Sequence, residues 1–231
     1  MSLQRIINVC ESLNIDRRRL VSVQYTRSEI AKVNETTSRN PWKFTLGISA
    51  ALQYGPNRDL LEEIDRLDRT KAEIISFSNS ATGASKGLAY MFAYQGGNLT
   101  NTANLTVQSF TGNQLVLTSL PTVAQSGGAT TIMFKKGDFV QIKGYPYPFT
   151  VTADVLRGTS DLVGATITLT THRPNFISAD LTGLKLNVGN DCQFRMFCPN
   201  MPTYKLTPGG ANALINWSSD FQLVEYTGDV L

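Results

Sequence analysis

The sequence has little of what most catalytic and metal sites are built from. Its 231 residues contain one histidine, His172, and three cysteines, Cys10, Cys192 and Cys198, with no CxxC pair. Structural zinc sites take four ligands, mostly Cys and His, and His is the commonest general acid or base. The sequence also lacks a Walker loop and a GxGxxG loop. We therefore expect a protein that is not an enzyme and needs no cofactor or metal ion.

Long hydrophobic runs and a strong excess of charge are missing as well. No stretch approaches the ~18 apolar residues of a membrane-spanning helix. The chain has 21 basic and 18 acidic residues, a net charge of +3, which is too small to attract it strongly to nucleic acid or a charged membrane. An odd number of cysteines predicts free, buried thiols in a reducing compartment. We expect synthesis in the cytoplasm and no membrane contact.

What the sequence does contain is alternation of apolar and polar residues. From Trp42 to Leu52 every even position is apolar, which is typical of a half-buried β-strand. The opposite face of this strand carries Lys43, Thr45 and Ser49. We predict that these three side chains form a subunit contact or line a channel.

Two more alternating runs precede this strand, at residues 9–16 and 20–27. They predict a hairpin across a basic cluster formed by Arg17, Arg18 and Arg19. Residues 28–41 then form a long polar loop, and loops longer than ~12 residues are uncommon in compact domains unless they bind something or are disordered. We predict that this segment is a contact arm between subunits. Its candidate contact residues are Arg27, Ser28, Glu29, Lys32, Asn34, Glu35 and Arg39.

One amphipathic helix is predicted over residues 57–69, with Asn57 as its N-cap. Its apolar stripe is expected to pack on a sheet, and its charged residues to form exposed pairs such as Glu62 with Arg66. The stripe consists of Leu60, Leu61, Ile64 and Leu67. Residues 73–78 and 90–94 are predicted as further strands.

A series of short apolar runs separated by Gly, Pro and Asn fills the middle of the chain. This spacing predicts a small β-barrel over residues 96–190, inserted into a first domain made of residues 1–95 and 191–231. The barrel strands are expected at 105–110, 114–120, 139–143, 149–156, 165–171 and 184–188, and strands of the first domain at 192–198 and 221–227. We interpret Pro208-Gly209-Gly210 as a turn.

Two features of the middle segment have both a functional and a purely structural interpretation. His172 precedes Arg173-Pro174, which favours a surface turn residue over a general base or metal ligand. Tyr145, Tyr147 and Phe149 follow Lys143, and aromatic side chains beside basic ones are typical of single-strand binding. The same residues also fit a rigid, proline-bounded hairpin tip.

Four segments carry a resemblance to known proteins. ESLNIDRR (11–18), VQYTRS (23–28), SRNPWKFT (38–45) and LLEEIDRLDR (60–69) resemble the tail and baseplate proteins of long-tailed bacteriophages, in particular distal-tail proteins. The resemblance implies a mainly β fold: a tail-tube-like β-sandwich with one packed helix, plus an inserted small OB-like β-barrel.

The same resemblance implies a structural role in the virion. The protein would assemble in the host cytoplasm into a homo-oligomeric, hexameric ring that joins the tail tube to the baseplate hub. DNA would pass through the ring without specific binding. The alternative is a stand-alone binding module whose barrel domain binds glycan or single-stranded nucleic acid.

Overall fold

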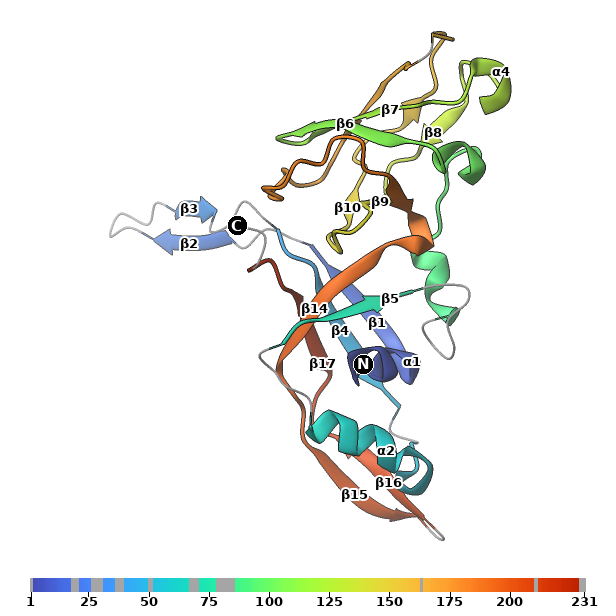
Figure 1. The fold of residues 1–231 in the computed structure, drawn as a ribbon. Helices are drawn as coiled ribbons and strands as arrows, with labels where there is room; N and C mark the ends of the chain where they lie inside the picture. The colour runs from blue at the N-terminus through green and yellow to red at the C-terminus, as the bar shows by residue number, and fades with distance from the viewer. Residues whose placement is uncertain are drawn as a thin grey trace.

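The structure, a computed structural model, is mainly β, with curled antiparallel sheets (Figure 1). It describes residues 2–17, 21–25, 31–35, 40–49, 52–66, 71–77, 86–162, 164–209 and 212–228. No helix within these ranges is long and apolar enough to cross a membrane.

The elements follow one another in this order: α1 (Ser2–Asn8), β1 (Cys10–Asp16), β2 (Val21–Tyr25), β3 (Ala31–Glu35), β4 (Lys43–Ile48), α2 (Tyr54–Asp65), β5 (Glu73–Ser76), the 3₁₀ helices η1 (Ala89–Phe92) and η2 (Leu99–Thr102), β6 (Thr106–Thr111), β7 (Gln114–Thr118), α4 (Val123–Ser126), β8 (Ile132–Phe134), β9 (Phe139–Ile142), β10 (Phe149–Thr150), β11 (Val155–Leu156), β12 (Ile167–Thr170), β13 (Leu186–Val188), η3 (Gly189–Asp191), β14 (Gln193–Asn200), β15 (Tyr204–Gly209), β16 (Asn212–Trp217) and β17 (Phe221–Glu225).

A five-stranded sheet with the order β1-β4-β17-β14-β5 combines strands from both ends of the chain. Its inner face carries the side chains that the alternation at 42–52 predicts to be buried, including Phe44 and Leu46, both 0% exposed. The ring of Phe194 from β14 lies edge-on to that of Phe44, with centroids 5.0 Å apart. We call the cluster around these rings the first core. Edge-to-face aromatic pairs of this kind add to the stability that the burial of the rings provides.

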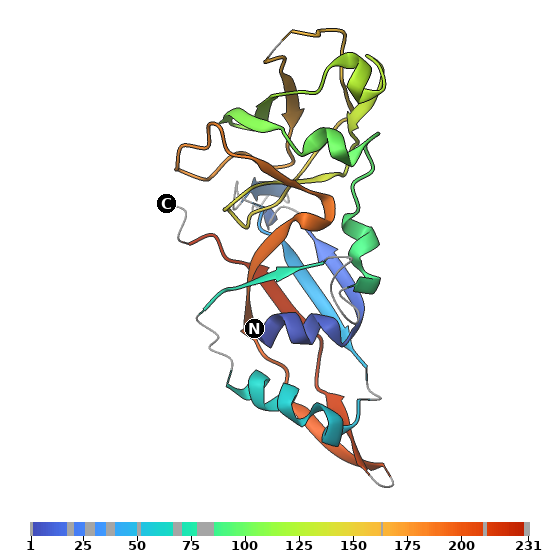
Figure 2. The same ribbon diagram turned by 45° about the vertical axis from the view of Figure 1, so that its right-hand side comes forward.

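Helices α1 and α2 both contribute to the first core. Figure 2 shows α1 against the sheet, with α2 and the β15–β16 hairpin at one end of the molecule. The sequence reading missed α1, although Leu3, Ile6 and Ile7 have helical spacing and are all buried. The buried stripe of α2 is confirmed for Leu60, Leu61 and Ile64.

The predicted start of α2 is wrong. The helix begins at Tyr54, and its N-cap is Gln53 rather than Asn57. Asn57 instead donates its side-chain N–H to the carbonyl oxygen of Gln53 (2.9 Å). Gly55 N–H is satisfied by the side-chain oxygen of Asn212 from β16 (3.1 Å). Because a tertiary contact satisfies this donor, the helix extends further than its local sequence indicates.

A second cluster of buried side chains, the second core, is built from residues 105–188. All six predicted runs in this region contain strands, and the structure adds β8, which the sequence reading missed. One predicted strand is wrong: residues 90–94 include the 3₁₀ helix η1. Phe139, which lies within the predicted insertion, packs into the first core. The two cores therefore meet across interlocked side chains.

The pairing predicted for the N-terminal strands is also wrong. β1 pairs with β4, while β2 pairs with β3 in register Val23↔Val33. The polar segment 28–41 is thus not one loop, because β3 occupies its centre. β1 pairs with β4 because Leu13 and Ile15 can then join Phe44 and Leu46 at the first core. The alternation of apolar and polar residues within one strand does not show which distant strand it will pair with.

The last strands form a hairpin that the sequence reading did not predict. β15 pairs with β16, with Pro208 opposite Ala213 and Gly209 opposite Asn212. Gly210, the third residue of the predicted turn, lies outside the described residues. Ile215 N–H donates to the carbonyl oxygen of Leu52 (2.8 Å), which attaches the hairpin to the start of α2.

Candidate functional site

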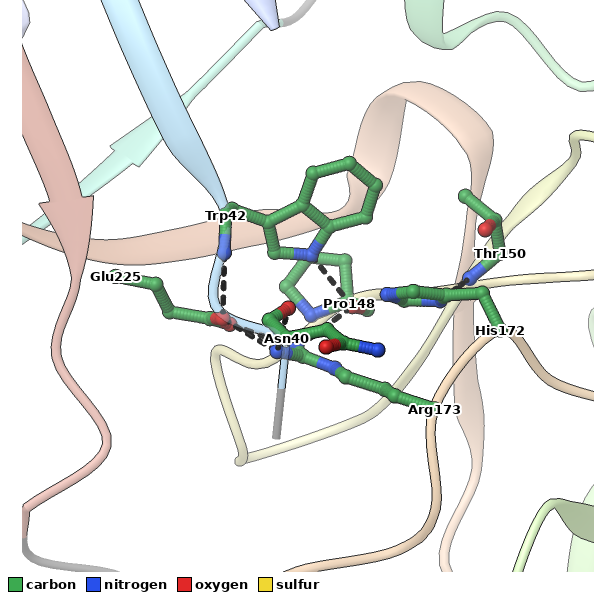
Figure 3. Close-up of polar contacts among 7 residues, drawn as sticks. All are labelled: Asn40, Trp42, Pro148, Thr150, His172, Arg173 and Glu225. Carbon is green, nitrogen blue, oxygen red and sulfur yellow. Dashed lines mark hydrogen bonds and ion pairs between the residues drawn. The ribbon is translucent and has the colours of Figure 1, made fainter. Parts of the chain in front are cut away.

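The two cores are joined by a fully buried ion pair. Arg173 follows β12 in the second core, and Glu225 ends β17 of the five-stranded sheet. Both side chains are 0% exposed, and Arg173 Nη2 lies 2.8 Å from Glu225 Oε1. Figure 3 shows the guanidinium group facing the carboxylate, in a two-pronged arrangement. Bidentate pairs of this kind fix relative orientation as well as charge.

Neighbouring groups add further hydrogen bonds and ring contacts to this pair. Trp42 N–H donates to Glu225 Oε2 (3.1 Å), and the Trp42 indole N–H donates to the carbonyl oxygen of Pro148 (2.9 Å). Arg173 Nη2 donates to the same carbonyl oxygen (2.9 Å). The rings of Phe149 and Phe176 lie 5.0 and 4.8 Å from the guanidinium carbon. A buried charge needs this degree of compensation to be tolerated.

Further contacts around the ion pair hold the two cores together. Gln141 Oε1 accepts from Gln193 N–H (3.1 Å), and Arg195 N–H donates to the carbonyl oxygen of Pro146 (3.1 Å). Arg17 donates to the hydroxyl of Thr150, and its guanidinium carbon lies 5.8 Å from the Trp42 ring. We call this set of contacts the junction. It fixes the second core relative to the sheet.

His172 belongs to the junction, so its prediction as a surface turn residue is wrong. Its Nδ1 accepts from Thr150 N–H (3.0 Å), and its ring centroid lies 5.1 Å from that of Trp42. Burial, and then the charges of Arg173 and Arg17, lower the pKa of His172 to about 3. The imidazole is therefore neutral at physiological pH, and Nδ1 is already committed as an acceptor.

The chemistry of a metal centre or reactive thiol finds little support in the described part of the chain. No group of three or more His, Cys, Asp or Glu side chains that could hold a metal ion occurs there. Cys10, Cys192 and Cys198 are buried and free, as the sequence predicts. Burial raises the pKa of the Cys10 thiol to about 11, so it stays protonated and unreactive.

The aromatic residues of the proposed nucleic-acid surface are used internally. Tyr147 is 2% exposed and Phe149 is 0% exposed, both within the second core. Arg195 Nη1 also donates to the hydroxyl of Tyr147 (3.2 Å). The segment therefore fits the rigid, proline-bounded tip better than a stacking platform, because two of its three rings are buried and only Tyr145 is partly exposed.

Only Arg17 of the predicted basic cluster lies within the described residues. Arg17 points into the junction, where it contacts Thr150 and the Trp42 ring. Arg18 and Arg19 lie outside the described residues. One of the three arginines thus has a structural partner within the same chain.

The face predicted to contact subunits or line a channel lies on the outer side of the five-stranded sheet. Lys43 and Thr45 are half-buried and alternate with the buried Phe44. Thr45 lies between Asn14 of β1 and Gln222 of β17, which are both exposed. Ser49, which follows β4, is half-buried. We call this surface, represented by Asn14, Lys43, Thr45 and Gln222, the outer face. Since α1 and α2 pack on the inner side, it is polar and uncovered by these helices.

The predicted contact arm is in part a projecting hairpin. Of its candidate residues, Lys32, Asn34 and Glu35 lie in β3, while Arg27, Ser28, Glu29 and Arg39 lie outside the described residues. β2 and β3 pair with each other and with no other described strand. In Figure 1 they extend away from the sheet. A lone two-stranded hairpin is at best marginally stable in water.

A shallow pocket of about 340 Å³ lies on the second core, near η2 and α4. Its lining is uncharged, and Ser119 within it has a φ of 63°, a left-handed conformation that non-glycine residues seldom adopt. The lining residues are Thr100, Asn101, Asn104, Ser119, Leu120, Pro121 and Gln125. Amide and hydroxyl groups of this kind suit a neutral polar ligand.

The ion pair of the junction predicts an asymmetric mutational response. Arg173→Met leaves the Glu225 carboxylate buried without its cation and is expected to lower the unfolding free energy by about 3–5 kcal/mol in urea denaturation. The double variant Arg173→Met/Glu225→Gln should recover part of that loss. Arg66→Met, which removes an exposed partner of Glu62 at 3.7 Å, is the control and should cost under ~1 kcal/mol. Equal effects at both sites would contradict the role of the junction.

The single histidine predicts a pH dependence. Its pKa rises from about 3 when folded to 6.5 when unfolded, so between these values the unfolded chain binds an extra proton and stability falls as the pH falls. From pH 7.5 to 5.5 the wild-type protein should lose about 1.4 kcal/mol more than His172→Gln, which keeps an acceptor for Thr150 N–H. Urea denaturation at both pH values measures this, and parallel losses would show that His172 is not buried in its neutral form.

The chain matches no known protein family, and no curated protein is significantly similar to it. Its function is therefore inferred from three features of the described residues: the β2–β3 hairpin, the outer face and the pocket.

Proposed function

We propose that the protein is a structural component of a long-tailed phage virion, which self-assembles into a ring at the distal tail and joins the tail tube to the baseplate hub. The observation that carries the proposal is the β2–β3 hairpin, which extends from a rigid body and pairs with no other described strand. A projecting hairpin of this kind is a liability in a monomer and a contact element in an assembly.

The junction supports an architectural role for the rest of the chain. Its buried ion pair, its shared carbonyl acceptor at Pro148 and its ring contacts hold two cores in one orientation. A ring requires every copy to present its contact surfaces at the same angle, because small angular errors accumulate around the circle. On this proposal the first core is a tail-tube-like sandwich and the second an OB-like barrel.

The outer face fits the wall of a channel through which DNA passes. Its central side chains are polar, and its Lys43 lies opposite Asp16 in the β1–β4 register, so one positive and one negative group face each other. A strongly basic wall would retain DNA through its phosphates. The near-neutral composition of this face instead permits passage, with DNA as a transient occupant and neighbouring subunits, tube proteins and hub proteins as stable partners.

Removal of the hairpin tests the proposal. Asp16 is paired with Lys43, so replacing residues 18–39 with a short Gly/Ser linker joins two ends that are already adjacent. We expect a folded monomer, because both cores lie outside the deletion, together with complete loss of rings in sedimentation velocity and negative-stain images.

Leu162→Ser, on an exposed side chain of the second core's surface (77% exposed), is the matched control and should assemble like the wild-type chain. A wild-type protein that stays monomeric at every concentration would refute the proposed function. Rings formed by the linker variant would refute the role of the hairpin alone.

The pocket near η2 and α4 supports a second candidate function, a binding module. Its uncharged amide and hydroxyl lining favours a glycan over a nucleic acid, which requires cations for its phosphates. A glycan screen followed by calorimetry tests this candidate. Binding that is lost in Asn104→Ala/Gln125→Ala, by a protein that forms no rings, would favour the module over the virion component. Absence of binding across the screen would exclude it.

A further inference from the structure

The two edge strands of the five-stranded sheet differ in whether another group covers their outward backbone N–H and C=O groups. At the β5 edge, the side chain of Gln4 from α1 takes the place of a neighbouring strand. Its Oε1 accepts from Ser76 N–H (2.9 Å), and its Nε2 donates to the carbonyl oxygen of Ser76 (3.1 Å). Leu3 N–H also donates to the carboxylate of Glu73 (3.0 Å). The helix therefore closes this edge to another strand.

The β1 edge has no such cover among the described residues. β1 pairs with β4 on one side and stands at the end of the strand order. Glu11, Ser12 and Asn14 along it are exposed. An edge strand in this position presents alternate N–H and C=O groups outward, which form a template for one more strand.

The chain itself contains a candidate for that strand. β2 begins a few residues after β1, and local alternation favours a β1–β2 hairpin, yet in the structure β2 pairs with β3 and leaves β1 open. The result is one open acceptor edge and one projecting donor hairpin on the same polypeptide. Exchange of such an element between identical copies is a low-cost route to assembly.

We propose that the outer edge of β1 in one copy accepts the β2–β3 hairpin of a second copy as the next strands of its sheet. The inference rests on the proposed function, which it deepens by naming the subunit contact. Donor and acceptor are different surfaces, so the contact is head-to-tail, the type of contact that forms a ring when its rotation closes. The closed β5 edge prevents the competing pairing of β1 with β5 of another copy, which gives the contact its direction.

Hydrogen–deuterium exchange on the intact protein tests the contact directly. In assembled wild-type protein, the β1 amides that point away from β4 should exchange at least ~10-fold more slowly than in the linker variant that lacks residues 18–39. The amides of β5, whose edge is already closed within each copy, serve as the internal control and should exchange equally in both. Rings with unprotected β1 amides would overturn this inference and leave the proposed function standing.

A matched pair of proline variants tests the same edge by a second route. Successive N–H groups in a strand point to opposite sides, so of Leu13→Pro and Asn14→Pro one removes an outward donor and the other a donor to β4. The outward variant should stay folded and lose ring assembly, because proline is tolerated at a free edge but cannot donate to a new strand. The other variant should be destabilised. Normal rings from both would overturn the inference.

Mixing gives the final readout. The folded proline variant keeps only its donor hairpin, and the linker variant keeps only its acceptor edge. Together they should form a 1:1 heterodimer that does not grow, detected by sedimentation velocity. If the two variants stay separate monomers after mixing while the wild-type protein alone forms normal rings, the subunit contact must lie elsewhere. Wild-type protein without rings would remove both this contact and the proposed function.

Discussion

The relative position of the two halves of the molecule depends on the buried ion pair of Arg173 with Glu225. One partner comes from the end of the last strand and the other from a turn after β12, so the pair forms only when the whole chain has folded. Desolvation makes such a pair a weak source of net stability. Its effect is selective: any other docking of the two cores would leave a charge and the carbonyl oxygen of Pro148 unsatisfied in an apolar environment.

This constraint connects the chemistry of the junction with the properties expected of an assembly component. With the second core fixed on one side of the sheet, the open β1 edge and the polar outer face keep a constant orientation relative to that core. His172 and Arg17 are candidate functional residues in the sequence, but in the structure both contact Thr150, and the His172 ring also packs beside that of Trp42. These contacts contribute to the rigidity of the junction. Both side chains are thus used in contacts within the chain, while the β1 edge stays open among the described residues.

Most strands were predictable, while their partners were not. The alternation at Trp42–Leu52 correctly indicated a strand with Phe44 and Leu46 on its buried side, and the stripe of α2 was equally plain. The β1–β2 hairpin was wrong because alternation is a local signal, whereas pairing depends on which distant apolar face completes the core. Helix α1 could have been found from the spacing of Leu3, Ile6 and Ile7. Nothing local could have placed His172 beside Trp42, more than a hundred residues away in the chain.

By itself the sequence determined the β-rich class, the amphipathic faces, the free buried thiols and the shortage of metal-binding and catalytic groups, because each follows from residue type and short-range period. Tertiary structure decided which side chains of those faces meet. It paired Arg173 with Glu225 and buried the rings of Tyr147 and Phe149. It also covered the β5 edge of the sheet with Gln4 and left the β1 edge open among the described residues. These outcomes depend on satisfying buried charges and backbone donors across long separations, a condition that only the folded chain imposes.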